Sequence, residues 1–296
     1  MNSVRKMLAQ YDILPRKRLG QSFLSDMNIT RKIVALAEPA GDETIVEIGA
    51  GLGFMTEELA RKAGKVIALE IDPRLIAVLR DRFTGSARVE IEVGDVLKYD
   101  FSTSCPAGKI KIVGNIPYPI STPILFRLLE FRRSISSMVL MFQKELADRI
   151  TAPPGTKEYG IPSVIIARHA SVTRELTVPS TCFYPEPGVA SAVLKVVMYD
   201  EPETPEEESR FVLTVRAAFA RRRKTLWNNL RAAGFDEEML ARVLQKIGIE
   251  GKRRAETLSV GEFSRLSAAL AEAGSAENIC AGKSCAEKFL DRGESV

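Results

Sequence analysis

Over residues 43 to about 145, short apolar runs rich in β-branched residues alternate with patterns typical of amphipathic helices. The runs predict strands at residues 44–48, 66–70, 89–93, 110–113 and 137–142. The intervening patterns predict helices at residues 56–63, 73–83 and 123–131. Such alternation favours an α/β fold with a parallel sheet, helices on both faces and ligands at the carboxyl ends of the strands. Two later runs, at residues 163–171 and 191–198, predict an antiparallel pair that closes the sheet.

The composition and the hydrophobic pattern of the sequence change after residue 199. Residues 200–209 are rich in proline and glutamate, as linkers are, and the patterns beyond them are helical throughout. Ser259 and Glu262 have the spacing of a capping box, which marks the start of a helix. We therefore predict an N-terminal α/β domain over residues 1–199, a small all-α domain over 200–273 and a flexible tail over 274–296.

Composition restricts the class of protein. The chain has 296 residues, of which 45% are hydrophobic, and no apolar run approaches the ~18 residues needed to span a membrane. We expect a cytoplasmic protein without membrane contact. The net charge is only +4, but residues 210–254 hold twelve Lys or Arg against four Asp or Glu, and residues 5–18 form a second basic cluster. Two such clusters suggest a polyanionic partner, most plausibly nucleic acid.

Three of the predicted strands end in residues suited to a bound nucleoside. Glu47 and a Gly-x-Gly-x-Gly turn over residues 49–53 follow the first strand; alone, this could be no more than a tight turn. Glu70 ends the second strand, where a carboxylate can accept hydrogen bonds from both ribose hydroxyls. Asp95 follows the third, within reach of a cofactor's adenine amine. Because the glycine spacing argues against nicotinamide, the three strand ends predict another adenosine-containing cofactor.

Residues 115–118, Asn-Ile-Pro-Tyr, follow the fourth predicted strand. A fixed carboxamide oxygen and a nearby backbone carbonyl can accept both hydrogens of an adenine amine while an aromatic ring stacks on the base, and Asn115 and Tyr118 fit these roles. Among adenosine-containing cofactors, S-adenosylmethionine suits transfer to this amine best, because its sulfonium methyl is already electrophilic. This chemistry requires no metal and no strong base, and we interpret the single histidine, His169, as structural.

These motifs resemble those of the KsgA/RsmA/Dim1 family of small-subunit ribosomal RNA adenine N6-dimethyltransferases, over residues 15 to 270 or so. Residues 17–24 are similar to the family's N-terminal motif, with Ser22 in place of its usual asparagine. Residues 183–187 match its Phe-x-Pro-x-Pro loop, after which Gly188 and Ala190 replace a lysine and an aspartate. Residues 219–226 resemble the basic motif that opens its C-terminal domain.

The resemblance implies a Rossmann-like S-adenosylmethionine-dependent methyltransferase fold with a mostly parallel seven-stranded sheet and an all-α C-terminal domain. It implies cofactor contacts by Gln21, Ser22, Leu24, Glu47, Gly49, Gly51, Glu70, Ile71, Asp95, Val96 and Asn115. The target site would comprise Asn115, Ile116, Pro117, Tyr118 and Phe183, with Phe183 placed to sandwich the flipped adenine against Tyr118. RNA contacts are expected from Arg16, Lys17, Arg18, Arg221, Arg222, Arg223 and Lys224, the last four distributed around a helix.

The function that the resemblance implies is dimethylation of N6 of two adjacent adenosines in the 3′-terminal hairpin loop of small-subunit ribosomal RNA, by a monomer acting on a pre-ribosomal 30S-type particle. Without the resemblance, the residues alone predict only methyl transfer to N6 of adenine. Two alternatives stay open: a large-subunit adenine N6-methyltransferase of the macrolide-resistance type, and a ribosome-assembly factor without catalytic activity.

Overall fold

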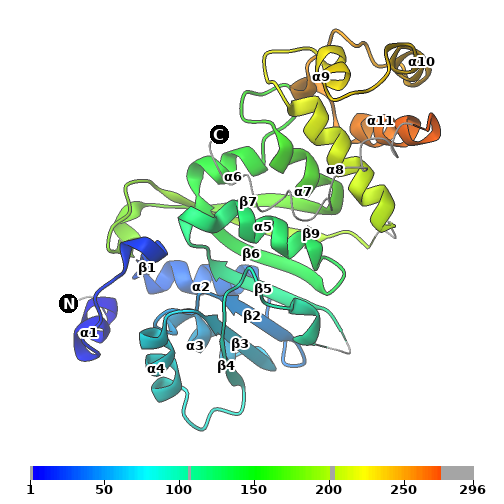
Figure 1. The fold of residues 1–296 in the computed structure, drawn as a ribbon. Helices are drawn as coiled ribbons and strands as arrows, with labels where there is room; N and C mark the ends of the chain where they lie inside the picture. Colours follow the sequence, from blue (N-terminus) through cyan, green and yellow to red (C-terminus); the bar gives the residue numbers. More distant parts are fainter. Residues whose placement is uncertain (1–2, 106–107, 201–203, 275–296) are drawn as a thin grey trace. The chain divides into compact units, whose positions relative to one another are not determined.

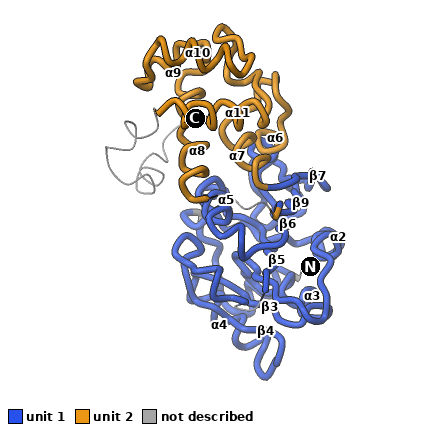
Figure 2. Tube along the Cα trace, turned by 90° about the vertical axis from the view of Figure 1, so that its right-hand side faces the viewer, with its two compact units in different colours: residues 1–147, 170–199 blue, residues 148–169, 200–296 orange. Residues whose placement is uncertain are grey.

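The computed structural model describes residues 3–105, 108–200 and 204–274 (Figure 1). It divides into two compact units: unit 1 comprises residues 1–147 and 170–199, and unit 2 comprises residues 148–169 and 200–296 (Figure 2). Among the described residues, no helix is both long and apolar enough to cross a membrane.

Unit 1 is built on a seven-stranded sheet with the strand order β4-β3-β2-β5-β6-β9-β7. The strands are β2 (Thr44–Ile48), β3 (Lys65–Glu70), β4 (Val89–Val93), β5 (Ile110–Asn115), β6 (Ile135–Gln143), β7 (Ala170–Val178) and β9 (Ser191–Met198). Strands β4, β3, β2, β5 and β6 are parallel, and β9 runs antiparallel to both β6 and β7. The chain order reverses between β2 and β5, so the carboxyl ends of these two strands form the switch point where such sheets bind ligands.

Most helices of unit 1 pack their apolar residues on this sheet, whereas the first one packs against the fourth through Val4 and Leu8. The helices are α1 (Ser3–Gln10), α2 (Met27–Leu36), α3 (Phe54–Ala60), α4 (Pro73–Arg82), α5 (Ser121–Glu130) and the first part of α6 (Lys144–Ile150). One core cluster joins Ile33 of α2 and Leu59 of α3 to Ile45 of β2 and Val193 of β9. A short second sheet pairs β1 (Phe23–Leu24) with β8 (Phe183–Tyr184). Burial of these apolar faces fixes the strand ends relative to one another.

The predicted α/β fold is confirmed, and each predicted strand between residues 44 and 142 overlaps an observed one. The run at residues 163–171 was predicted wrongly, because residues 161–169 form helix α7 (Ile161–His169) and the strand lies at Ala170–Val178. Val164, Ile165 and Ile166 are all buried. A short buried run of this kind has no periodicity that separates a strand from a helix.

Unit 2 consists of α7, α8 (Pro205–Phe219), α9 (Leu226–Ala232), α10 (Glu237–Ile247) and α11 (Val260–Glu272), together with the end of α6. The predicted capping box of Ser259 and Glu262 is present at α11. A second capping box starts α8, where Thr204 caps the helix and Pro205 takes its first position. The segment predicted as a linker over residues 200–209 is therefore helical from residue 205 onward.

The compact units differ from the predicted domains in one respect. Both divide the chain at residues 199/200, but unit 2 also includes residues 148–169. Helix α7 packs within unit 2: His169 Nε2 lies 3.0 Å from Oε1 of Glu208 on α8, and Arg168 Nη1 donates to Ser264 Oγ of α11 at 2.7 Å. This observed pairing agrees with the structural interpretation of His169. The predicted tail lies, beyond residue 274, outside the described residues.

Candidate active site

A pocket opens in unit 1 at the carboxyl ends of β2, β3, β4 and β5. Its lining includes every residue predicted to contact the cofactor: Gln21, Ser22, Leu24, Glu47, Gly49, Gly51, Glu70, Ile71, Asp95, Val96 and Asn115. It also includes Ile116, Pro117 and Tyr118 of the predicted target site. Thus the motifs that follow four different strands converge on one cavity, as parallel strands with a switch point require.

The glycine turn after β2 leaves one wall of this pocket as bare backbone. Gly49, Gly51 and Gly53 have φ angles of 69°, 60° and 78°, a region that other residues rarely adopt. A Cβ atom on Gly53 would lie 2.8 Å from the ring of Phe83, and one on Gly51 would lie 3.4 Å from the ring of Phe23. Conformation therefore favours glycine at all three positions, and space restricts Gly53 as well.

Glu70 is buried at the end of β3 and accepts hydrogen bonds from three backbone amides. Its Oε2 accepts from the N–H of Gly51, and its Oε1 accepts from the N–H groups of Ile71 and Asp72, all at 2.9 Å. Burial raises the pKa of Glu70, and the bonds from Asp72 and Gly51 oppose that rise. Since two carboxylate oxygens have about four acceptor positions, Glu70 retains capacity for a ligand hydroxyl.

Glu47 lies beneath the glycine turn and is almost fully buried. Its Oε2 accepts a hydrogen bond of 2.5 Å from the hydroxyl of Thr56 on α3. Burial raises the pKa of Glu47 to about 8, against the opposing effect of the Thr56 bond. The side chain is therefore a neutral acid at pH 7 in the free protein.

We expect the stability of the protein to fall as the pH rises from 5 to 8, because Glu47 is neutral in the folded state and ionises near pH 4.5 when unfolded. A raised folded-state pKa gives stabilisation that is complete below the unfolded pKa and is lost as the pH rises toward the folded one. Glu47→Gln cannot ionise, so its curve should be flatter over this window. Urea unfolding at several pH values checks this, with the exposed Glu206→Gln as the control. Identical pH profiles for the wild type and Glu47→Gln would contradict it.

Asn115 ends β5 with its side-chain amide anchored. Its Nδ2 donates a hydrogen bond of 2.9 Å to the backbone carbonyl of Ser22, so the amide plane is set by the N-terminal segment. The nearby backbone is also fixed, since the N–H of Ile116 donates to the carbonyl of Met141 at 3.1 Å. This orientation leaves Oδ1 of Asn115 as an acceptor at the pocket.

The ring of Tyr118 is half-buried at the pocket, in the short 3₁₀ turn Tyr118–Ile120. Its hydroxyl shares a hydrogen bond of 2.7 Å with Oγ of Ser191, a fully buried residue at the start of β9. Burial raises the pKa of Tyr118, so the phenol stays protonated. Sequence reasoning gave Ser191 no role, although this serine lies four residues after the matched proline-rich loop of residues 183–187.

Phe183 is not among the residues that line the pocket. Its side chain is 4% exposed and belongs to the core cluster that also contains Leu24. Phe183 lies opposite Leu24 in the β1/β8 pair, and side chains at directly opposed positions point to the same face. Leu24, in the same cluster, does line the pocket, so burial in this cluster leaves the stacking role of Phe183 a prediction.

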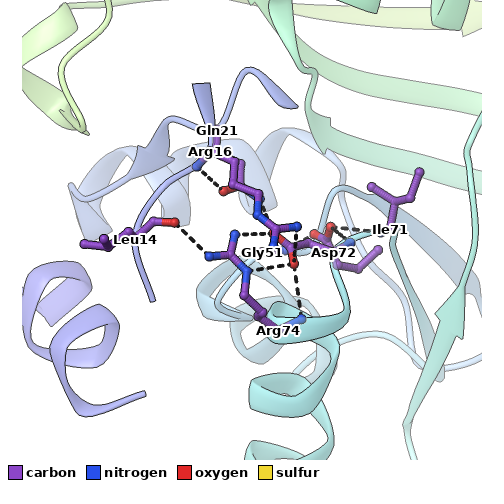
Figure 3. A network of polar contacts seen from close by, with 8 residues as sticks. Leu14, Arg16, Gln21, Gly51, Ile71, Asp72 and Arg74 are labelled. Carbon is purple, nitrogen blue, oxygen red and sulfur yellow. Dashed lines mark hydrogen bonds and ion pairs between the residues drawn. The ribbon is translucent and has the colours of Figure 1, made fainter. Parts of the chain in front are cut away.

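A network of polar contacts ties the N-terminal segment to the start of α4 (Figure 3). Asp72 caps α4, and its Oδ2 accepts from Arg74 Nη2 at 2.6 Å and from Gln21 Nε2 at 2.8 Å. Gln21 Oε1 in turn accepts from the backbone N–H of Arg16 at 2.8 Å, and Arg74 Nη1 donates to the carbonyl of Leu14 at 2.9 Å. Both ends of the Gln21 amide are thus engaged by the protein itself, as is the hydroxyl of Ser22, which donates to the carbonyl of Pro185.

Asp72 was not singled out from the sequence, yet a signal for it exists. An Asp-Pro pair at the start of a helical pattern predicts an N-cap at the aspartate. The bonds from Arg74, above all, and from Gln21 hold the pKa of Asp72 well below its usual range. Arg16 is a further neighbour, with Nη1 at 3.6 Å from Oδ1 of Asp72. Hence Arg16, predicted to bind RNA, belongs in part to this network, whereas Arg18 is exposed.

The basic run Arg221, Arg222, Arg223 and Lys224 lies in the turn between α8 and α9, so its predicted helical placement is wrong. The buried side chain of Asn229 ends α8 there: its Nδ2 donates to the carbonyls of Ala218 and Arg221 at 2.6 and 3.1 Å. All four cations are exposed. Within the described part of the chain, none of them has a carboxylate partner in an ion pair.

The residues that line the pocket have the chemical groups needed to bind S-adenosylmethionine. The bare glycine turn allows close approach, Glu70 and Asp95 offer acceptors, and Ile71 and Val96 offer apolar surface. Asp95 is partly engaged, because its Oδ1 accepts from the N–H of Leu97 at 3.0 Å. In the described segments we find no group of three or more His, Cys, Asp or Glu residues arranged to hold a metal ion.

Similarity to known proteins extends over most of the chain. A family model described as ribosomal RNA adenine dimethylase matches residues 14–272. A relative from Syntrophus aciditrophicus, named ribosomal RNA small subunit methyltransferase A, is 50% identical over 273 residues, which are 90% of this chain and 98% of that protein. A relative of the same name from Bacillus mycoides is 43% identical over 279 residues, with 91% and 96% covered.

Two solved structures are similar over both units. A dimethyladenosine transferase from Plasmodium falciparum has a TM-score of 0.73 at 27% identity, covering 85% of this chain and 98% of that one. The 23S rRNA methyltransferase ErmE has a TM-score of 0.68 at 26% identity, with 84% and 99% covered. Sequence and fold thus agree on the same group of enzymes.

Proposed function

Because the chain belongs to the ribosomal RNA adenine dimethylase family, we propose that it dimethylates N6 of two adjacent adenosines in the 3′-terminal hairpin loop of small-subunit ribosomal RNA. S-adenosylmethionine is the methyl donor. The observation that carries the proposal is the anchored amide of Asn115, which lies with Tyr118 in the pocket that Glu70 and Asp95 also line. The names of the two curated relatives support the small subunit over the large one.

The target amine is held by Asn115 and a loop carbonyl. With its Nδ2 bonded to Ser22, Asn115 presents Oδ1 to one amine hydrogen. The carbonyl of Pro117 already accepts from Ser121 Oγ and the N–H of Ile120, at 3.0 and 3.2 Å. The carbonyl of Ile116 is therefore the better acceptor for the second hydrogen. These two bonds shift electron density onto the amine nitrogen and align it for attack.

Aromatic contacts hold the flipped base. Tyr118 stacks on one face, and its bond to Ser191 restrains the ring. We assign stacking on the other face to Phe183, which lies opposite the pocket residue Leu24 in the β1/β8 pair. A base in a loop is less costly to extrude than one in a duplex, which suits the proposed target.

The bound cofactor supplies an electrophilic methyl group on its sulfonium. Glu70 would accept from the ribose hydroxyls, and Asp95 from the adenine amine, between Ile71 and Val96. Once a methyl is on the nitrogen, the amine proton becomes acidic and leaves without a dedicated base. The monomethylated amine keeps a hydrogen for Asn115, so a second transfer can follow with a fresh cofactor molecule.

RNA contact outside the pocket is assigned to Arg16, Lys17, Arg18 and to the four cations of the turn between α8 and α9. Arg18 and the four cations of the turn are exposed, and exposed cations, guanidinium groups above all, suit phosphate contact. We further propose that the protein acts as a cytoplasmic monomer on a pre-ribosomal 30S-type particle during small-subunit biogenesis; its two basic clusters support the contact with RNA.

We expect label from radioactive S-adenosylmethionine to enter only the small subunit when unmethylated small and large ribosomal subunits are supplied separately. Nucleoside analysis of each RNA should yield N6-dimethyladenosine from the small subunit. Label confined to the large subunit would indicate a large-subunit adenine N6-methyltransferase of the macrolide-resistance type. Binding of particles without any label would instead indicate an assembly factor.

A further inference from the structure

Residues 14–25, called the strap below, run beside the pocket and include the carbonyl that holds the amide of Asn115. The C-terminal end of the strap is fastened by β8, since β1 pairs with it and the N–H of Ser25 donates to the carbonyl of Cys182 at 2.8 Å. The N-terminal end is fastened at α4, through the bonds of Gln21 to Asp72 and of Arg74 to Leu14 (Figure 3).

Asp72 is a rigid point of attachment. Its carboxylate is buried, its Oδ1 accepts from the backbone N–H of Arg74 as the N-cap of α4, and its own N–H donates to Glu70 at 2.9 Å. The ribose acceptor and the strap anchor are therefore two residues apart on the same fixed turn. A hydrogen bond to a carboxylate is stronger than one between neutral groups, so the Gln21 contact is a firm one.

We propose that Asp72 and Gln21 are positioning residues for methyl transfer: their hydrogen bond fixes the Ser22 carbonyl, and that carbonyl fixes the amide of Asn115. Ser22 follows Gln21 directly, so movement of one displaces the other. The inference rests on the proposed function, because it needs Asn115 to hold the target amine. It also gives Gln21 a different role from the cofactor contact predicted from the sequence.

Loss of the hydrogen bond between Gln21 and Asp72 should affect the rate of methyl transfer more than the binding of S-adenosylmethionine. If the Ser22 carbonyl shifts, the amide of Asn115 can turn and its Oδ1 no longer points at the amine. The pocket walls formed by Glu70 and the glycine turn do not depend on Gln21. A small misplacement of an orienting group costs rate even when substrates still bind.

The first test compares Gln21→Ala with the matched control Gln10→Ala, an exposed glutamine on α1. For Gln21→Ala we expect kcat on small subunits to fall about tenfold, with a smaller change in the Kd for S-adenosylmethionine. Trypsin cleavage after Arg16, Lys17 or Arg18 in the isolated protein should quicken about tenfold, since cleavage follows local opening of the strap. Gln10→Ala should match the wild type in all three measurements.

The second test exchanges the amide of Gln21 and the carboxylate of Asp72 between the two positions. Gln21→Glu places a second carboxylate against Asp72 and should lower kcat further than Gln21→Ala. Combining Gln21→Glu with Asp72→Asn restores a donor and an acceptor between the two positions, and asparagine still caps α4. Because the amide at position 72 no longer accepts from Arg74, which can pair with the new carboxylate at position 21, kcat and trypsin resistance should recover in part.

Two results would overturn the proposal: wild-type kcat and cleavage rate in Gln21→Glu, or no recovery in the combined variant. Either would leave the proposed function standing if the wild type methylates small subunits. Conversely, a wild type without methyl transfer would sink the proposed function, and the cleavage rates would still report whether Gln21 and Asp72 hold the strap.

Discussion

Replacing Asn115 with alanine is expected to lower the rate of methyl transfer to small-subunit RNA by about 10³-fold. The substitution removes the Oδ1 acceptor for the target amine, and no other side chain in the pocket replaces an amide anchored by the Ser22 carbonyl. The Kd for S-adenosylmethionine should stay nearly unchanged, because Glu70 and the glycine turn are untouched. Single-turnover kinetics and calorimetric titration of the cofactor measure the two quantities separately.

Two further variants sharpen this result. Asn115→Asp keeps an acceptor oxygen but cannot donate to Ser22, so its rate should lie between the wild type and Asn115→Ala. Asn28→Ala removes an exposed carboxamide on α2 and serves as the matched control. A folded Asn115→Ala protein with near wild-type activity would refute the role given to this residue, and a thermal melt verifies the folding.

Replacing Arg221, Arg222, Arg223 and Lys224 together with alanine should weaken binding to the small subunit by about 10²- to 10³-fold at 0.15 M salt. Each lost phosphate contact removes part of the counterion release, so the slope of log K against log salt should become about 3 less steep. Filter binding at several salt concentrations measures both effects. Because the four side chains are exposed in a turn, fold stability should change little.

The control for this prediction carries the same loss of charge elsewhere. Lys62, Arg80, Arg88 and Lys98 are exposed cations of unit 1 outside both predicted RNA-binding clusters. Their joint replacement with alanine should reduce affinity much less and leave the salt dependence near that of the wild type. Equal losses in the two quadruple variants would mean that net charge, and not the turn, attracts the RNA.

The sequence predicted the sheet and the pocket well because both depend on local patterns. Short apolar runs rich in β-branched residues and turn glycines are readable from neighbouring residues, and parallel strands necessarily bring their carboxyl ends to one edge. The sequence alone therefore places Glu70 and Asn115 at one site. The run at residues 163–171 failed because apolar residues buried on all sides have no period to read.

Placement of single side chains was less predictable. Phe183 was expected to stack on the target base; it is 4% exposed and is not among the residues that line the pocket, and its stacking role stays a prediction. The run Arg221–Lys224 was expected on a helix, but the carboxamide of Asn229 ends α8 before it. Asn229 reaches carbonyls 11 and 8 residues earlier, a contact that the sequence of the basic run itself does not specify.

The sequence by itself thus determined the fold class, the order of the strand-end motifs and their meeting at one pocket. Tertiary structure decided how the side chains there are held: Gln21 bonds to Asp72, 51 residues away, and Asn115 bonds to Ser22, 93 residues away. Backbone periodicity is a property of adjacent residues and can be read from them. A hydrogen bond between distant residues forms only where packing of the whole unit brings donor and acceptor within about 3 Å.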